Sequence, residues 1–392
     1  MCLMAAESDP SQISRAFNIV SELVIPRTPD RPLVHPIGEY AEGEALEDYV
    51  VFFAGHGAPQ VAGMEKSLRQ IAQVENGYNS LETSLGYDMR SLTNDDLKET
   101  KYAQPIIASV NTFSALVHEH ANPDELKNTP YAVSGQSAGL LSAAWFAGIY
   151  GPRNTKDAVM LTIETAALRG EIMQQMKDNP PSGHMLISVG DRKTRATDEE
   201  RQIIDTIRRD SLQRENAVSL AIDISDGRII LGGETSDLKE AHQFLKDAYK
   251  GYNIHFYDVP TSCVGFHGNV MKPVEGQVRD LFEQQRKFMK PPQVPILSNT
   301  YQEPRLITTI DEYIAEQVRL VTHPVFGRDM NKFLEDKGID TGIEFGERGI
   351  IAKSMDGFDI TPRKVALAGS VLAAGVAATI GTGYLVKRSG KN

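Results

Sequence analysis

Residues 131–150 read YAVSGQSAGLLSAAWFAGIY, which predicts a strand, a sharp turn and a helix. The first four residues are an apolar run typical of a buried strand, and the segment from Leu140 to Tyr150 suits a buried helix. Between them stands GQSAG, a G-x-S-x-G motif whose glycines permit a sharp turn from strand to helix. Such a turn would hold the Ser137 hydroxyl clear of the sheet, beside the free N–H groups of a helix N-terminus. The pattern predicts a nucleophilic serine, with an incidental turn as the alternative.

Strand-like and helix-like segments alternate on both sides of this turn. Tyr49–Phe53 is a short apolar run that ends in GHG, and it predicts a buried strand followed by a tight turn. Residues 105–120 and 157–176 have the apolar spacing of helices. Such alternation is typical of a mainly parallel sheet covered by helices, so we predict an α/β fold. We expect its body to comprise residues 49–182 and 260–355.

Residues 183–259 are expected to form a smaller unit inserted into that body. Strand-like and helical segments follow one another here in the order β-α-β-β-α-β, which is the order of a ferredoxin-like module. The segments are HMLISVG, a charged helix at 197–214, AVSLAIDI, RIILGG, a helix at 238–249 and NIHFYDVP. Sheet-like sequence then resumes at 294–300 (VPILSNT), so the unit interrupts the body and does not follow it.

The two ends of the chain differ in character. Residues 1–48 contain IPRTPDRPLVHP, whose prolines block regular structure, so we predict a partly disordered extension. Residues 365–386 carry no charge and are flanked by basic pairs. As a helix this segment could cross a hydrocarbon core of about 30 Å, with the basic residues at the headgroups. It predicts a C-terminal apolar helix that anchors the protein in a membrane, with the catalytic body in the cytoplasm. A buried Ala/Gly-rich helix in a cytoplasmic protein is the alternative.

Composition excludes several classes of function. Acidic residues outnumber basic ones, 52 to 41, which leaves no basic stripe to neutralise the phosphates of a nucleic acid. The two cysteines, Cys2 and Cys263, are too few for a disulfide framework or a cysteine-built metal site.

A nucleophilic serine requires a neighbouring base, and the chain has nine histidines. His267 lies in a glycine-flanked loop just after the inserted unit and is one candidate. His118 and His120 at a helix end, and His35 in the N-terminal extension, suit surface positions. Arg169 lies among apolar residues of the helix at 157–176. Its side chain could reach solvent or present its two N–H groups to a carboxylate in a cleft.

Eight segments, taken in order, resemble the malonyl-CoA:acyl-carrier-protein transacylases, the acyltransferases of fatty-acid and polyketide synthesis. The segments are FAGHG (53–57), LGYDMRSL (85–92), QPIIASV (104–110), GQSAG (135–139), LRGEIMQ (168–174), GFHGNVMKP (265–273), VPILSNT (294–300) and HPVFGRDM (323–330). The resemblance covers about residues 49–355. It implies a hydrolase-like parallel-sheet body with an inserted ferredoxin-like subdomain.

The resemblance also implies roles for particular residues. Ser137 would be the acylated nucleophile and His267 its general base, oriented by a backbone carbonyl near Leu320. The backbone N–H groups of His56 and Ala138 would hold the oxyanion. These donors would stabilise the charge that develops in the tetrahedral intermediate.

Three further residues would bind the substrate. Arg169 matches the arginine that grips the free carboxylate of malonyl, and Gln104 lines the same cleft. Phe266 matches the bulky residue that excludes an α-methyl group in malonyl-selecting relatives. One methyl group in a pocket is worth about 1–3 kcal/mol, so Phe266 would confer a preference.

The implied reaction is a ping-pong transfer from malonyl-CoA to the pantetheine thiol of acyl carrier protein, with no metal or cofactor. The sequence departs from the family pattern near the site. Gln136 replaces a histidine beside the nucleophile, Leu140 replaces a glutamate, and IDISDGRII (222–230) replaces an asparagine-rich turn.

Two other functions fit parts of the sequence. A membrane-tethered serine hydrolase, such as a thioesterase, would use the chain order Ser…Asp…His, with Asp223, Asp226 or Asp258 as the acid. A carboxylate-binding arginine would have no purpose in such an enzyme. A non-catalytic adaptor with an acyltransferase fold is the other alternative, and the presence of Ser137, His267 and Arg169 argues against it.

Overall fold

The computed structural model describes residues 47–55, 65, 68–121, 126, 129–190, 196–213, 217–259, 264–339 and 341–346. It also describes strand residues 358–362, 365–366, 379–380 and 384–388. The extension predicted at residues 1–48 lies outside these ranges, apart from residues 47 and 48.

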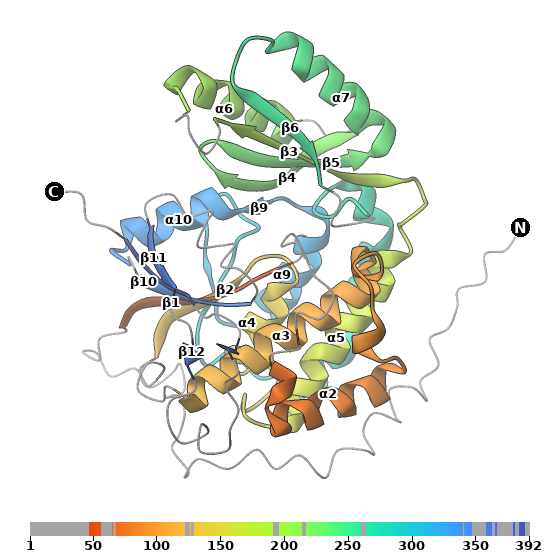
Figure 1. Cartoon of the computed structure of the whole chain (residues 1–392), viewed down its shortest axis with the longest axis vertical. Coiled ribbons are helices and arrows are strands. Elements are labelled where there is room, and N and C mark those ends of the chain that lie inside the picture. The colour runs from red at the N-terminus through yellow and green to blue at the C-terminus, as the bar shows by residue number, and fades with distance from the viewer. Residues whose placement is uncertain are drawn as a thin grey trace, which may run out of the picture.

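Seven of the described strands form one sheet with a parallel centre (Figure 1). The parallel strands are β10 (Thr341–Phe345), β1 (Glu47–Phe53), β2 (Pro130–Gly135) and β7 (Ile296–Leu297). Antiparallel strands complete the two edges: β8 (Leu306–Ile307) beside β7, then β14 (Tyr384–Arg388) and β11 (Phe358–Pro362) beyond β10. The predicted α/β fold is confirmed.

Helices cover both faces of this sheet. The helices of the body are α2 (Ala72–Leu85), α3 (Thr100–Ala121), α4 (Gly139–Phe146), α5 (Lys156–Gln174), α8 (Glu275–Gln285), α9 (Ile310–Thr322) and α10 (Gly327–Asp336). Short 3-10 helices lie at Leu68–Gln70, Met89–Ser91, Asp96–Lys98, Asn269–Val274 and Arg286–Phe288.

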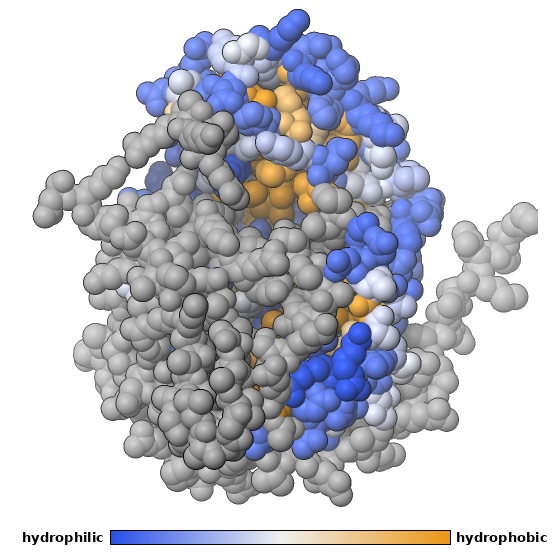
Figure 2. Space-filling view, in the orientation of Figure 1, coloured by the Kyte–Doolittle hydropathy of each residue, from blue (hydrophilic) through white to orange (hydrophobic). Residues whose placement is uncertain are grey.

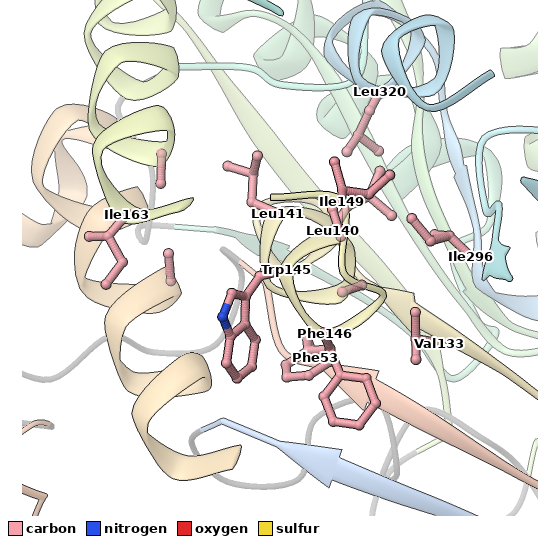
Figure 3. Close-up of a cluster of buried hydrophobic side chains, with 14 of the residues drawn as sticks. Phe53, Val133, Leu140, Leu141, Trp145, Phe146, Ile149, Ile163, Ile296 and Leu320 are labelled. Carbon is pink, nitrogen blue, oxygen red and sulfur yellow. The ribbon is translucent and has the colours of Figure 1, made fainter. Parts of the chain in front are cut away.

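The side chains of strand β1 point alternately to the two faces of the sheet and pack against different helices. Val51 and Phe53 belong to the main core with α3, α4 and α5, whereas Val50 and Phe52 belong to a second cluster with α10. Both sets are buried, as a central parallel strand requires. Figure 3 shows part of the main core around Phe53, whose ring centroid lies 5.7 Å from that of Phe146 on α4.

A second sheet belongs to the ferredoxin-like module at one end of the molecule (Figure 1). Its elements are β3 (Ser182–Val189), α6 (Asp198–Gln213), β4 (Val218–Ser225), β5 (Arg228–Glu234), α7 (Thr235–Ala248) and β6 (Ile254–Asp258). The antiparallel order is β6-β3-β5-β4. The body contributes a fifth strand, β9 (Val325–Phe326), which pairs in parallel with β4. In the view of Figure 2, an apolar area between module and body interrupts a mostly hydrophilic coloured surface.

The prediction of a transmembrane helix at residues 365–386 is not supported: the described residues of this segment, 365–366, 379–380 and 384–386, are strand residues, and the others lie outside the described ranges. Residues 365–366 (β12, Val365–Ala366) pair with residues 379–380 (β13, Thr379–Ile380), and β14 joins the main sheet beside β10. The β-branched residues Val365, Thr379 and Ile380 of the paired strands favour this conformation. No helix in the described residues is long and apolar enough to cross a membrane.

Candidate active site

The turn between β2 and α4 carries Ser137 in a left-handed backbone conformation, with a φ of 52°. Three positions at this turn leave no room for a side chain and must be glycine. A Cβ on Gly139 would lie 2.2 Å from the carbonyl oxygen of Phe53, and one on Gly135 would lie 2.2 Å from the backbone of Gly139. A Cβ on Gly55 would lie 1.8 Å from the carbonyl oxygen of Gln136. The close approach of β1, the turn and α4 therefore fixes the position of the Ser137 side chain.

Ser137 and His267 lie in hydrogen-bond contact although 130 residues separate them. The Oγ of Ser137 is 3.0 Å from the Nε2 of His267, and the Nδ1 of His267 is 2.6 Å from the carbonyl oxygen of Leu320 on α9. His267 also has a positive φ of 62°, and its backbone N–H donates to the carbonyl of Val321 at 3.0 Å. Two consecutive carbonyls of α9 thus hold both the backbone and the ring of His267.

These contacts determine the tautomer of His267. A carbonyl oxygen only accepts hydrogen bonds, so Nδ1 must carry the proton that it donates to Leu320. Nε2 is then an acceptor for the hydroxyl of Ser137, which is the arrangement that a general base needs.

The three aspartates considered for the hydrolase alternative have other places in the described structure. Asp223 binds Arg208 at 2.8 Å and Asp226 binds Arg328 at 2.7 Å, while Asp258 ends β6. The orienting group is a backbone carbonyl, so the Ser…Asp…His triad of the hydrolase alternative is not formed.

The helix α4 begins directly behind Ser137. Ala138 occupies the N-cap position, at the end of a helix where backbone N–H groups have no intrahelical acceptor. The positive end of the helix dipole lies there as well. His56, the other residue predicted to hold the oxyanion, lies outside the described residues.

Arg169 lies on α5 and is buried, with 1% of its surface exposed, so its side chain does not reach solvent. Its Nη1 contacts the Oε1 of Gln104 on α3 at 3.4 Å, and its Nε has no hydrogen-bond partner among the described residues. No carboxylate in the described ranges pairs with it. Burial lowers the pKa of Arg169 to about 10, so the guanidinium keeps its charge at neutral pH.

Arg169 is connected to the nucleophile turn through α3. Gln104, which contacts Arg169, is flanked on α3 by Ala103 and Ile107, and both pack against Ala138. The phenol groups of Tyr150 and Tyr313 also lie near the guanidinium. The helix α3 thus contacts both the buried cation, through Gln104, and the residue that follows Ser137, through Ala103 and Ile107.

Phe266 is buried next to His267 and packs against His184 of β3, with ring centroids 5.4 Å apart. The Nε2 of His184 lies 3.1 Å from the carbonyl oxygen of Phe266 and donates to it. Burial lowers the pKa of His184 to about 4. The module thus contributes a neutral histidine that holds the residue before His267.

We expect His184 to make the protein sensitive to acid. Because the folded-state pKa of about 4 lies below the value of 6.5 in the unfolded chain, the unfolded state binds the proton first as pH falls. The free energy of unfolding should drop by about 3 kcal/mol between pH 6.5 and 4 through this group alone. Urea unfolding of wild type and His184→Gln at several pH values measures this. If the stability difference between the two proteins does not change with pH, the expectation is wrong.

Several residues that support the site were not predicted as such. Asn299 donates from Nδ2 to the carbonyl of Gly135 at 3.1 Å, and Asn111 donates to the carbonyl of Ala54 at 2.8 Å. The carboxylate of Glu316 on α9 accepts hydrogen bonds from the hydroxyls of Ser298 and Thr300. Asn299 lies within VPILSNT, one of the eight segments on which the family resemblance rests, so that resemblance could have pointed to it. Neither Asn111 nor Glu316 has a local pattern that marks it.

His267 also lines a cleft of about 940 Å³ between the module and the body. Its walls include Ser219 and Leu220 of β4 on the module side, and Arg319 and Thr322 of α9 on the body side. The cleft is large enough for an extended ligand to approach the Ser137–His267 pair. Within the described residues, no group of three or more His, Cys, Asp or Glu side chains could hold a metal ion.

Solved structures of malonyl transacylases match the chain over most of its length. One is a malonyl-transacylase solved in complex with the acyl-carrier protein of a type II polyketide synthase, with 20% identity, 79% of this chain and 92% of that chain covered, and a TM-score of 0.64. Another is the malonyl-CoA:acyl carrier protein transacylase of Helicobacter pylori, with 22% identity and a TM-score of 0.62. The match covers 78% of this chain and 91% of that chain.

A third is FabD from Acinetobacter baumannii, with 19% identity, 80% of this chain and 91% of that chain covered, and a TM-score of 0.63. No protein-family model matches the chain, and no curated protein matches it in sequence. The similarity is therefore one of structure. The chain has the fold of the malonyl-CoA:acyl carrier protein transacylases.

Proposed function

We propose that this protein transfers a malonyl group from malonyl-CoA to the pantetheine thiol of an acyl carrier protein, through an acyl-enzyme on Ser137. One observation carries the proposal: α3 contacts both a buried, charged arginine that has no carboxylate partner in the described residues and the turn that holds the serine of a serine–histidine pair. The names of the structurally similar proteins support the same substrate and acceptor.

In the first half-reaction, the Ser137 hydroxyl attacks the thioester carbonyl while its proton passes to Nε2 of His267. The carbonyl of Leu320 stabilises the imidazolium that forms, because Nδ1–H already donates to it. The backbone N–H of Ala138 and the α4 dipole stabilise the oxyanion. The intermediate then collapses, the carbon–sulfur bond breaks, and His267 returns the proton to the departing thiolate of coenzyme A.

The second half-reaction reverses these roles. His267 accepts the proton of the pantetheine thiol, and the thiolate attacks the ester carbonyl of malonyl-Ser137. The carbon–oxygen bond breaks and Ser137 regains its proton from His267. The cleft between module and body gives both thiols a route to the pair. No metal or cofactor enters either half-reaction.

Arg169 would provide the selectivity for a dicarboxylic acyl group. A buried ion without a partner is costly by several kcal/mol, and a substrate carboxylate offsets that cost. The guanidinium presents paired N–H donors that match a carboxylate in a bidentate contact. An acetyl group has no such carboxylate and would leave the charge unpaired.

Intact mass spectrometry tests the function directly. After brief mixing with malonyl-CoA, wild-type protein should gain the mass of one malonyl group, and Ser137→Ala should gain none. Acetyl-CoA under the same conditions should give much less adduct. Release of free coenzyme A without an adduct would indicate a hydrolase, and neither adduct nor release would favour the adaptor.

A further inference from the structure

The cleft between module and body has a positively charged wall. Its charged lining residues are Lys272, Arg305 and Arg319 against one carboxylate, Glu303, which leaves an excess of two positive charges. His323 lines the cleft as well, and burial together with the charge of Arg319 lowers its pKa, so it is neutral at neutral pH. The whole chain, in contrast, carries a net charge of −11. A cleft lined by one sign of charge attracts ligands of the opposite sign, so this wall favours an anion.

Tyr301 holds two of these cations in place. The guanidinium carbon of Arg305 lies 3.8 Å from the ring centroid of Tyr301, and that of Arg319 lies 4.3 Å from it. Arg305 also donates from Nη2 to the hydroxyl of Tyr301, and Arg319 donates from Nε to the carbonyl of Thr300 at 3.1 Å. Side chains that are fixed before a ligand arrives lose less freedom when they bind it. The two guanidinium groups are therefore preorganised beside one aromatic ring.

Neither arginine has an ion-pair partner in the described part of the chain. Glu312 interacts electrostatically with Arg305, but its carboxylate accepts hydrogen bonds from the backbone N–H groups of residues 308 and 309 at 2.9 and 3.1 Å. Both Nη groups of Arg319, and the Nε and Nη1 of Arg305, remain without an acceptor among the described residues. Paired N–H donors of this kind match the oxygens of a phosphate.

The place of the two arginines in the cleft points to the ligand that carries this phosphate. Arg319 directly precedes Leu320, whose carbonyl binds the ring of His267, and both Arg319 and His267 line the same cleft of about 940 Å³. In the proposed reaction two thiols come to His267, one on coenzyme A and one on the carrier protein. Each thiol ends a pantetheine arm that carries a phosphate ester at its other end. A ligand whose thiol reaches His267 would therefore have its phosphate elsewhere in the same cleft.

We propose that Arg305 and Arg319, held by Tyr301, bind the phosphate ester of the phosphopantetheine arm that coenzyme A and acyl carrier protein share. The inference rests on the proposed function, because that reaction supplies both ligands. One site would then serve both half-reactions, so coenzyme A must leave before the arm of the carrier protein enters. A hydrolase that acts on plain acyl esters would have no use for such a site.

Calorimetric titration of the full chain tests the site without any acyl transfer. Wild type should bind phosphopantetheine at least about tenfold more tightly than pantetheine, since hydrogen bonds between charged groups add that much affinity. In Arg305→Gln most of this difference should disappear, and Arg305→Lys should lie between the two proteins. Equal binding of phosphopantetheine and pantetheine by wild type would overturn the proposal.

Coenzyme A and 3′-dephospho-coenzyme A separate the two possible sources of the phosphate. Both carry the phosphate at the end of the pantetheine arm, and only coenzyme A carries the 3′-phosphate of the ribose. Wild type should bind them within a few fold of each other. A preference that appears only between these two ligands, and that Arg305→Gln loses, would assign the arginines to the 3′-phosphate and contradict the proposal.

A purely structural role of the arginine–tyrosine stack gives a different result. If Arg305 only held residues 301–305 against α9, Arg305→Gln would weaken phosphopantetheine and pantetheine alike, and that outcome would also contradict the proposal. Arg228→Gln is the matched control, because Arg228 is exposed and does not line the cleft. It removes the same charge from the chain and should bind all four ligands as wild type does.

Acylation of Ser137 extends the test to the reaction. The ratio of kcat/KM for malonyl-CoA to that for malonyl-pantetheine should fall about tenfold in Arg305→Gln, through KM, and should stay unchanged in Arg228→Gln. An unchanged ratio in Arg305→Gln would count against the phosphate site. If no donor acylates the wild-type protein, the proposed function fails, whereas the titrations still decide whether the arginines bind phosphate.

Discussion

Replacing Arg169 with methionine should lower kcat/KM for malonyl-CoA by about 10²–10³-fold and should change the value for acetyl-CoA little. Truncating one partner of a buried charged pair costs about 2–5 kcal/mol, and 1.36 kcal/mol corresponds to tenfold in rate. The same change should leave the free protein at least as stable, because it removes a buried charge that has no carboxylate partner among the described residues. Loss of activity with no loss of stability is the signature of a substrate-binding arginine.

Steady-state transfer to acyl carrier protein and thermal unfolding measure the two effects. Arg153→Met is the matched control, because Arg153 is also buried but pairs with Glu119 at 2.7 Å. That variant should be less stable and should keep the ratio of malonyl to acetyl transfer. Arg169→Lys retains the charge but lacks the paired N–H donors of the guanidinium. Its kcat/KM for malonyl-CoA should therefore lie between those of wild type and Arg169→Met. An unchanged malonyl-to-acetyl ratio in Arg169→Met would show that another residue binds the carboxylate.

Local sequence was enough to predict the nucleophile turn. A buried strand, two glycines around a serine and an apolar helix are adjacent in the chain, so neighbouring residues determine the geometry of Ser137. The contact between His267 and Leu320 was different, since 53 residues separate them. Composition and spacing left His267 as one of several candidates, and only the resemblance to a family paired it with Ser137 and Leu320.

Residues that act through distant partners were the hardest to predict. Glu316 is a buried carboxylate whose partners are three hydroxyl and amide groups near residue 299, and its place in an amphipathic helix gave no sign of this. The helix α3 begins at Thr100, five residues before the proline that was taken as its start. In the tail, the absence of charge predicted a helix, whereas residues 384–386 belong to β14 and pair with β10. In each case tertiary contacts outweighed the local pattern.

Both members of the Ser137–His267 pair have a positive φ, which non-glycine residues rarely adopt. Such conformations cost about 1–3 kcal/mol each and persist only where surrounding contacts determine them. Here the glycine turn holds Ser137, and the carbonyls of Leu320 and Val321 hold His267. The pair is therefore positioned before any substrate binds, which reduces the reorganisation needed in the transition state.

Replacing His267 with alanine should slow formation of malonyl-Ser137 by about 10²–10⁴-fold, the usual contribution of a positioned general base. The remaining rate would come from the N-terminus of α4 and from substrate binding, which the variant keeps. Because His267 lines the cleft, alanine opens space there for a small molecule, and imidazole added to the buffer should restore part of the rate. Rapid-quench mass spectrometry of the adduct measures both effects. His242→Ala is the control, since His242 stacks on Phe256 in the module, and it should acylate at the wild-type rate. A His267→Ala protein that acylates within a few fold of wild type would show that Ser137 takes its activation from another group.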